Sequence, residues 1–150
     1  MPSHILSYPS LGDSPTIFVN IINPQTGRPQ IFQMLVDTGA SRTCLPAVRA
    51  AFLGHDNLDG LVKTTEISGV GGKSNAFIHT LRLELIDPEG NIWRKLIPPW
   101  RSEFMPVLFV EKMETQAGIL GRDILEQWKH LGFRPTPKAH HSRWVVEIEL

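Results

Sequence analysis

The stretch Leu35-Val36-Asp37-Thr38-Gly39-Ala40 is the most informative part of this sequence. It places a carboxyl group directly after an apolar run, and the Thr and Gly that follow turn the chain. A carboxylate beside buried apolar residues is costly unless hydrogen-bond donors surround it. The hydroxyl of Thr38 and a closely approaching backbone N–H at Gly39 can supply such donors. By itself the pattern fits an acid kept for chemistry and a plain turn-initiating aspartate equally well.

The residues on both sides of this stretch have the composition of β-strands. Residues 16–22 and 31–36 are rich in β-branched and aromatic residues and flank a segment with Asn, Pro and Gly, which predicts a hairpin. Residues 62–67 and 76–86 flank the glycine-rich run SGVGG, which predicts a second hairpin. Further strands are expected at 91–97, 106–110 and 143–150. The sequence therefore predicts a mostly β fold.

Two short helical segments are expected within this β fold. Residues 47–53 have helix-forming composition and stop at Gly54, which predicts one or two helical turns. Near the C-terminus, apolar residues recur at helical spacing and a glycine can close the helix. The residues of this late helix are Ile124, Leu125, Trp128, Leu131 and Gly132.

Length and composition limit the kinds of protein this can be. The 150 residues fit a single domain over 1–150, with its core at about 16–150. Fifteen Lys and Arg balance fifteen Asp and Glu, so no basic surplus indicates a nucleic-acid partner. No apolar run reaches the length of a membrane span, and the polar N-terminal stretch does not resemble a signal peptide. The single cysteine, Cys44, suits a reducing compartment, so the cytoplasm is the expected location.

Two further segments extend the pattern around the aspartate. Ile67-Ser68-Gly69-Val70-Gly71-Gly72 lies at the tip of the second expected hairpin, and Ala117-Gly118-Ile119-Leu120-Gly121-Arg122-Asp123-Ile124-Leu125 leads into the late helix. With all three segments in this order, residues 16–128 resemble the retropepsins, the aspartic proteases of retroviral type. The resemblance implies a closed β-barrel of the acid-protease fold with one C-terminal helix.

The resemblance also implies roles for the residues of the first segment. Asp37 matches the catalytic aspartate of the family. Thr38 matches the residue whose hydroxyl bonds across a two-fold axis to its mate, and Gly39 the residue whose carbonyl accepts a substrate N–H. Substrate contacts are expected to continue at Ala40 and Ser41. At Ser41 many retroviral enzymes place an acid that pairs with an arginine, so the partner of the matching arginine here stays open.

The second and third segments match the family's flap and the support beneath its active site. Backbone N–H groups at the flap tip hold the peptide in the family through a bridging water. The expected flap and pocket residues are Ile67, Ser68, Gly69, Val70, Gly71 and Ile119. Arg122 and Asp123 match a structural pair below the active site.

A single Asp-Thr-Gly implies that the protein acts as a homodimer. Aspartic proteolysis needs two carboxylates on one water, one as general base and one as general acid. Asp37 alone has the required context among the six aspartates, so a second copy must supply its mate. No cofactor is expected, and the substrate is a peptide in extended conformation. Residues 143–150 are expected to join a dimer sheet, with an ordinary edge strand as the alternative.

The sequence also bears on functions other than proteolysis. A retropepsin-like module that binds peptide or dimerises without efficient catalysis keeps the fold and stays open. The run GVGGKS at 69–74 is similar to a phosphate-binding loop, but Ile67 stands where the first glycine belongs and a strand pattern follows. The six histidines, including the adjacent His140 and His141, lack metal-ligand spacing, so no metal site is expected. Cys44 is expected to be a small packed residue.

Overall fold

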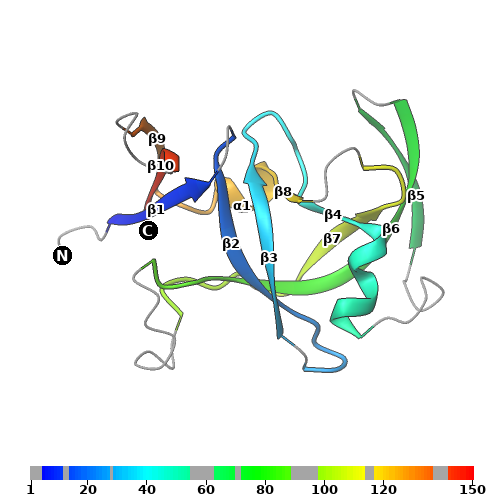
Figure 1. Ribbon diagram of the computed structural model, residues 1–150. Coiled ribbons are helices and arrows are strands. Elements are labelled where there is room, and N and C mark those ends of the chain that lie inside the picture. Colours follow the sequence, from blue (N-terminus) through cyan, green and yellow to red (C-terminus); the bar gives the residue numbers. More distant parts are fainter. Residues whose placement is uncertain are drawn as a thin grey trace.

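The computed structural model describes residues 5–11, 14–27, 29–54, 63–69, 72–88, 98–113, 117–136 and 142–150. Figure 1 shows that strands dominate these residues. The strands are β1 (Ile5–Leu11), β2 (Thr16–Ile22), β3 (Pro29–Val36), β4 (Cys44–Pro46), β5 (Lys63–Gly69), β6 (Gly72–Leu85), β7 (Met105–Val110), β8 (Gly118–Leu120), β9 (His130–Pro135) and β10 (Ser142–Glu149). The helical elements in the described part are the 3-10 helix η1 (Ala47–Leu53) and the four-residue α-helix α1 (Arg122–Leu125).

Six strands close into a barrel. They follow the order β2-β3-β8-β4-β7-β6, and the last strand returns to the first because β6 also pairs with β2. The length of β6 makes this possible, since residues 76–81 pair with β7 and residues 82–85 pair with β2. The remaining strand, β5, pairs with the first half of β6 and extends the sheet beyond the ring (Figure 1).

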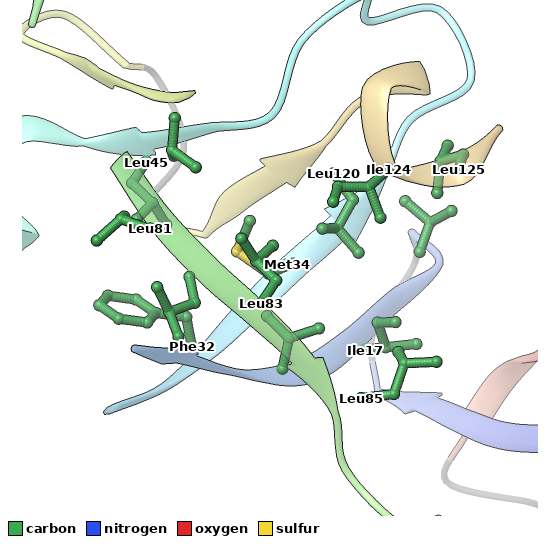
Figure 2. Packing of buried hydrophobic residues seen from close by; sticks show 14 of the residues in the cluster. Ile17, Phe32, Met34, Leu45, Leu81, Leu83, Leu85, Leu120, Ile124 and Leu125 are labelled. Carbon is green, nitrogen blue, oxygen red and sulfur yellow. The ribbon is translucent and has the colours of Figure 1, made fainter. Parts of the chain in front are cut away.

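Alternating apolar residues fill the barrel. Successive side chains of a strand point to opposite faces, so every second residue faces the interior. In β2 these are Ile17, Val19 and Ile21, each at most 2% exposed. Figure 2 shows side chains from β2, β3, β6, β8 and α1 meeting in one cluster, among them Met34 and Leu120. Burial of this apolar surface is the main stabilising contribution to the barrel.

A second sheet joins the two ends of the chain. Its order is β1-β10-β9, with all neighbours antiparallel. The predicted terminal strand is therefore confirmed, and Val146 and Ile148 on its predicted face are buried. Both neighbours of β10 belong to the same chain, as the alternative of a strand within one subunit expected, but β10 is the central strand of the sheet and not an edge strand. Neither β1 nor β9 was predicted.

The predicted late helix is too long. It ends at Leu125, and Leu131 and Gly132 belong to β9. The spacing of apolar residues was misleading because Trp128 is buried outside the helix, where its ring meets Trp100 edge to face at 5.6 Å. The N–H of the residue after Trp128 already bonds to a carbonyl of β10, so the sheet takes over where the helix was expected.

Other predicted elements have clear outcomes. The first hairpin is β2–β3 and the second is β5–β6, and the predicted helical turns at 47–53 form η1. The predicted strand at 106–110 is β7. The strand expected at 91–97 lies outside the described residues. Within the described ranges, every helix falls short of the length and apolar character that a membrane crossing requires.

Candidate active site

Asp37 lies at the rim of the barrel, directly after β3. Strand β8 runs parallel to β3 on one side and antiparallel to β4 on the other, and residues 37–43 connect β3 to β4. The backbone N–H of Asp37 donates to the carbonyl of Leu120 at 3.1 Å, and the N–H of Val36 donates to the carbonyl of Pro15 at 2.9 Å. The aspartate is therefore fixed from both neighbouring strands.

The Asp-Thr-Gly sequence forms a tight turn around the carboxylate. The N–H of Gly39 donates to Oδ1 of Asp37 at 2.9 Å, and the N–H of Ala40 donates to the Asp37 carbonyl at 3.2 Å. Asp37 is half-buried, whereas Thr38, Gly39 and Ser41 are exposed. The turn thus holds a carboxylate with a backbone donor, as expected for Gly39, and leaves it beside exposed residues where water and substrate have access.

Asp123 holds the far end of the same loop. Its two carboxylate oxygens accept the backbone N–H of Thr43 at 3.0 Å each, and Oδ1 also accepts the Thr43 hydroxyl at 2.7 Å. That hydroxyl oxygen in turn accepts the N–H of Gly121 at 3.1 Å. Thr43 is fully buried, so these bonds satisfy polar groups that would otherwise be costly. Thr43 could not be recognised from local sequence patterns, because its partner Asp123 lies 80 residues along the chain.

Arg122 contributes to the loop through its backbone. Its N–H donates to the carbonyl of Ala40 at 2.8 Å, while its side chain is exposed. Asp123 uses its side chain on Thr43, as described above. The two residues expected as a structural pair therefore both support the loop that carries Asp37, one through its backbone and one through its carboxylate.

Two glycines allow the chain around β8 to lie close to its neighbours. A Cβ at Gly121 would stand 2.6 Å from the backbone oxygen and 2.7 Å from the backbone nitrogen of Arg42. A Cβ at Gly118 would stand 2.7 Å from Cδ2 of Leu45 and would also overlap the side chain of Met34. Glycine is therefore required at Gly121, where the overlap is with backbone atoms, whereas at Gly118 the overlap is with the ends of two side chains.

The expected flap corresponds to the β5–β6 hairpin. Ile67, Ser68 and Gly69 end β5, and Gly69 pairs with Gly72 at the start of β6. The predicted residues Val70 and Gly71 lie outside the described residues. The predicted hairpin is therefore confirmed, and its strands extend further into the glycine-rich run than the predicted ranges 62–67 and 76–86.

A second apolar cluster lies near the aspartates, separate from the barrel core. It is formed by Cys44, Ala76, Leu108 and Val110, with Ile78, Met113 and Ile119 packed against it. Strand β7 contributes to both clusters, because Val107 and Phe109 belong to the barrel core. A strand buried on both faces has a continuous run of apolar residues in its sequence. The run PVLFV at 106–110 is of this kind and is consistent with burial on both faces.

Cys44, a member of this cluster, lies close enough to Asp123 and Asp37 for their charges to affect its pKa. Burial raises the pKa of the Cys44 thiol to about 11, and the negative charges of Asp123 and then Asp37 add to the effect. The thiol therefore stays protonated at neutral pH and packs as a small apolar group. Ile119, the predicted pocket residue, is paired with Cys44 across β8 and β4.

Two cavities lie elsewhere, on either side of η1. One has a volume of about 330 Å³ and the other about 270 Å³, and both are lined by Arg49 and Phe52. Asp37 lines neither of them. Asp37 thus lies in a surface turn, and the glycine-rich β5–β6 hairpin belongs to the same sheet. A molecule on which the Asp37 carboxylate acts would have to bind at this surface.

Comparison with solved structures supports the fold. The chain is similar to the structure of a retropepsin-like aspartic protease from Rickettsia conorii, with 17% sequence identity and a TM-score of 0.56, over 99% of this chain and 96% of that chain. It is also similar to EIAV protease complexed with the inhibitor HBY-793, with 24% identity and a TM-score of 0.49, over 79% of this chain and 90% of that chain. Among curated proteins, none matches the sequence.

Comparison with family models covers the part of the chain that builds the site. A model described as Aspartyl protease matches residues 26–124, which include the Asp37 turn, β8 and Asp123. The closed barrel and the short helix match the retropepsin-like fold that the sequence predicted, so this prediction is confirmed. The chain belongs to the aspartyl protease family.

Proposed function

We propose that the protein is an aspartic endopeptidase that works as a homodimer, with Asp37 of each subunit acting on one water molecule. The observation that carries the proposal is the Asp37 turn itself, fixed at its backbone by Leu120 and at its carboxylate by Gly39. Family membership supports peptide-bond hydrolysis as the reaction. The whole chain is proposed to be one domain, with no cofactor.

The chemistry explains why a second copy is needed. In aspartic proteases, whose paired carboxylates share one proton, the ionised acid removes a proton from water and the protonated acid donates one to the scissile carbonyl. Asp123 is not proposed as the second acid, because its carboxylate accepts the N–H and hydroxyl of Thr43 and so fastens the loop within the chain. The sequence has no second Asp-Thr-Gly, so the partner is Asp37 of another chain.

The substrate is proposed to be a peptide in extended conformation. It would lie between the Asp37 turn and the β5–β6 hairpin, whose glycine-rich end can approach a peptide backbone closely and close over it. The proposed contacts are Thr38, Gly39, Ala40, Ser41, Ile67, Ser68, Gly69, Val70, Gly71 and Ile119. Apolar residues beside the cleaved bond are favoured, because Ile119 packs in the apolar cluster around Cys44.

The cytoplasmic location stays a prediction from the sequence.

The test is replacement of Asp37 by its neutral isostere. In Asp37→Asn, cleavage of a peptide library between pH 3 and 7 should fall by at least about 100-fold, since a general acid–base group is removed. The matched control is Glu103→Gln, which changes an exposed acid to its amide and should leave the rate unchanged. Circular dichroism checks that both variants fold.

One result would contradict the proposal. If the wild-type protein forms dimers and binds peptides but cleaves none of them across this pH range, the protein is a binding module of the same fold.

A further inference from the structure

A buried polar network away from Asp37 joins three elements of the barrel. Asn23 follows β2 and is 0% exposed, and His79 in β6 is 2% exposed. Nδ2 of Asn23 donates to the carbonyl of Leu53, the last residue of η1, at 2.8 Å. Oδ1 of Asn23 lies 3.3 Å from Nε2 of His79. One side chain therefore bonds to the end of η1 and to the middle of β6 at the same time.

Backbone groups fix the orientation of the Asn23 amide. Nδ2 faces the Leu53 carbonyl, and Oδ1 accepts the N–H of Gln25 at 2.9 Å. Because Oδ1 can only accept, Nε2 of His79 carries the proton that joins the two side chains. Removing either side chain would take a hydrogen-bond partner from a buried polar group, which is costly.

The turn that carries Asn23, residues 23–27, is closed on itself and packed against the end of η1. The N–H of Gly27 donates to the Asn23 carbonyl at 2.8 Å. A Cβ at Gly54, directly after η1, would stand 2.9 Å from Cγ2 of Thr26. In Figure 1 this turn and the end of η1 lie side by side at the bottom of the picture. Asn23 is therefore itself well fixed and can fix the groups that it binds.

His79 lies at the base of the β5–β6 hairpin. The described pairs of that hairpin end with Lys63 and Ile78, and His79 is the next residue of β6. On its other side β6 pairs with β7 here, with His79 opposite Val107. The contact with Asn23 thus lies where the ladder with β5 ends and β6 continues into the barrel.

Leu53 lies on the other approach to the same hairpin. It ends η1, and β5 starts at Lys63, while residues 55–62 between them lie outside the described residues. Asn23 therefore bonds to the chain before the hairpin, at Leu53, and to the strand that leaves it, at His79.

The acid lies at the opposite end of β3 from this network. Strand β3 starts at Pro29, soon after the Asn23 turn, and ends at Val36, directly before Asp37. A strand of 8 residues spans about 25 Å. A change at Asn23 should therefore reach the hairpin directly and the Asp37 carboxylate only through the whole of β3.

We propose that Asn23 is a positioning residue for the β5–β6 hairpin, which it links through Leu53 and His79 to the β2–β3 turn. The proposal rests on the proposed function, in which this hairpin closes over the peptide. A hairpin with a fixed base loses less conformational entropy when it closes. Asn23 thus favours binding of the peptide and takes no part in proton transfer.

The first test measures opening of the hairpin by hydrogen exchange and needs no substrate. In Asn23→Ala, amide exchange in β5 and in residues 72–78 should be at least about fivefold faster, because the base of the hairpin opens more easily. Exchange in the terminal sheet β1-β10-β9 should change by less than about twofold. Unchanged exchange in the hairpin, or equal acceleration in the hairpin and the terminal sheet, would overturn the proposal.

The matched control removes another buried side-chain hydrogen bond. Ser10 is 1% exposed, and its Oγ accepts the N–H of Thr16 at 2.7 Å and donates to the Ser14 carbonyl at 2.9 Å. Ser10→Ala should accelerate exchange in the terminal sheet and leave the hairpin like wild type. Acceleration of the hairpin in Ser10→Ala as large as in Asn23→Ala would contradict a specific link.

The second test separates peptide binding from the chemical step. In Asn23→Ala, KM for peptide cleavage should rise at least about threefold and kcat should change by less than about twofold, because contacts with the hairpin are lost equally before and in the transition state. A fall in kcat without a rise in KM would mean that Asn23 acts on the acid, and would overturn the proposal.

Two variants of His79 test the same link, and they decide the matter if Asn23→Ala does not fold. His79→Leu removes the donor to Asn23 and should accelerate exchange in the hairpin and raise KM. His79→Gln keeps an N–H donor near the position of Nε2 and should behave like wild type. Wild-type behaviour of His79→Leu, or equal effects of the two variants, would overturn the proposal.

Failure of the link and failure of the protease can be told apart. If Asn23→Ala loosens only the hairpin but the wild type cleaves no peptide, the link is supported and the protease is contradicted. If the wild type is active and Asn23→Ala changes neither exchange in the hairpin nor KM, the role of Asn23 is contradicted and the protease stays in place.

Discussion

Two carboxylates near the barrel rim are held in different ways. Both carboxylate oxygens of Asp123 accept hydrogen bonds from buried Thr43, through its N–H and its hydroxyl. Asp37 accepts an N–H from Gly39 and lies beside exposed residues. The aspartate at position 123 therefore fastens the loop, whereas the aspartate at position 37 lies at the surface. The groups around each side chain cause this difference in role.

At the residue scale, Cys44 should make stability depend on alkaline pH. The folded thiol keeps its proton to about pH 11, whereas its ordinary pKa is 9.0. Between these values the folded state binds more protons than the unfolded state, so the free energy of unfolding falls as pH rises. A shift of this size corresponds to about 2–3 kcal/mol. Urea unfolding at pH 8, 9, 10 and 11 measures the loss.

The control for this prediction is Cys44→Ala, which should show a smaller decline over the same range. Burial and then the charge of Asp87 raise the pKa of Tyr8 as well, so Tyr8 also lowers the free energy of unfolding at alkaline pH. This contribution is the same in the wild type and in Cys44→Ala, because both proteins keep Tyr8. If the wild type and Cys44→Ala lose stability in parallel, Cys44 is not the group responsible.

At the scale of elements, the site depends on β8 fitting between β3 and β4. Parallel pairing with one and antiparallel pairing with the other brings residues from distant parts of the sequence to one rim. The chain leaves β8 through Gly121, where the space that a Cβ would occupy is filled by the backbone of Arg42. The position of the Asp37 loop is therefore set by a close backbone contact as well as by hydrogen bonds.

Replacing Gly121 by alanine tests this contact. A Cβ would overlap backbone atoms of Arg42, which cannot rotate away, so the free energy of unfolding should fall by at least about 1–3 kcal/mol. Activity should fall as well, because the Asp37 loop must shift. The matched control is Gly132→Ala in β9, where the nearest atom to the new Cβ is 3.5 Å away. Equal stability of the two variants by urea unfolding would contradict the argument.

Local patterns in the sequence predicted some elements well and could not predict others. Both hairpins follow from apolar strands around Gly- and Pro-containing turns, and the Asp37 turn follows from three adjacent residues. The bond from Thr43 to Asp123 joins residues 80 positions apart, so no local pattern reports it. The prediction of the late helix was too long for a related reason. Leu131 has helical spacing from Trp128, but Leu131 pairs with Ile148 in the sheet, and this pairing determines the conformation of Leu131.

At the scale of the whole molecule, the fold has a closed part and an open part. The barrel ring leaves none of its six strands unpaired on either side, because β6 returns to β2. Among the described residues, the strands with an outer edge that no strand pairs with are β1 and β9 in the terminal sheet and β5 in the large sheet. Pairing with a strand of another chain is therefore limited to these three edges of the described part.

The proposed homodimeric active site predicts that activity depends on protein concentration. Specific activity should fall on dilution below the dimer dissociation constant, because a single chain has one Asp37. Rates per milligram over a 1,000-fold dilution series, made at saturating substrate and fixed pH, measure the effect. Constant specific activity down to concentrations at which sedimentation shows single chains would mean that the monomer is competent.

The separation between Thr43 and its anchor also has a consequence during synthesis. The Asp37 loop leaves the ribosome long before Asp123, which lies 80 residues further along the chain than Thr43. At translation rates of about 5–20 residues per second, the loop waits roughly 4–16 s for its anchor. A nascent chain therefore carries Asp37 before Asp123 is available to bind Thr43, so the proposed active site can form only after Asp123 has been translated.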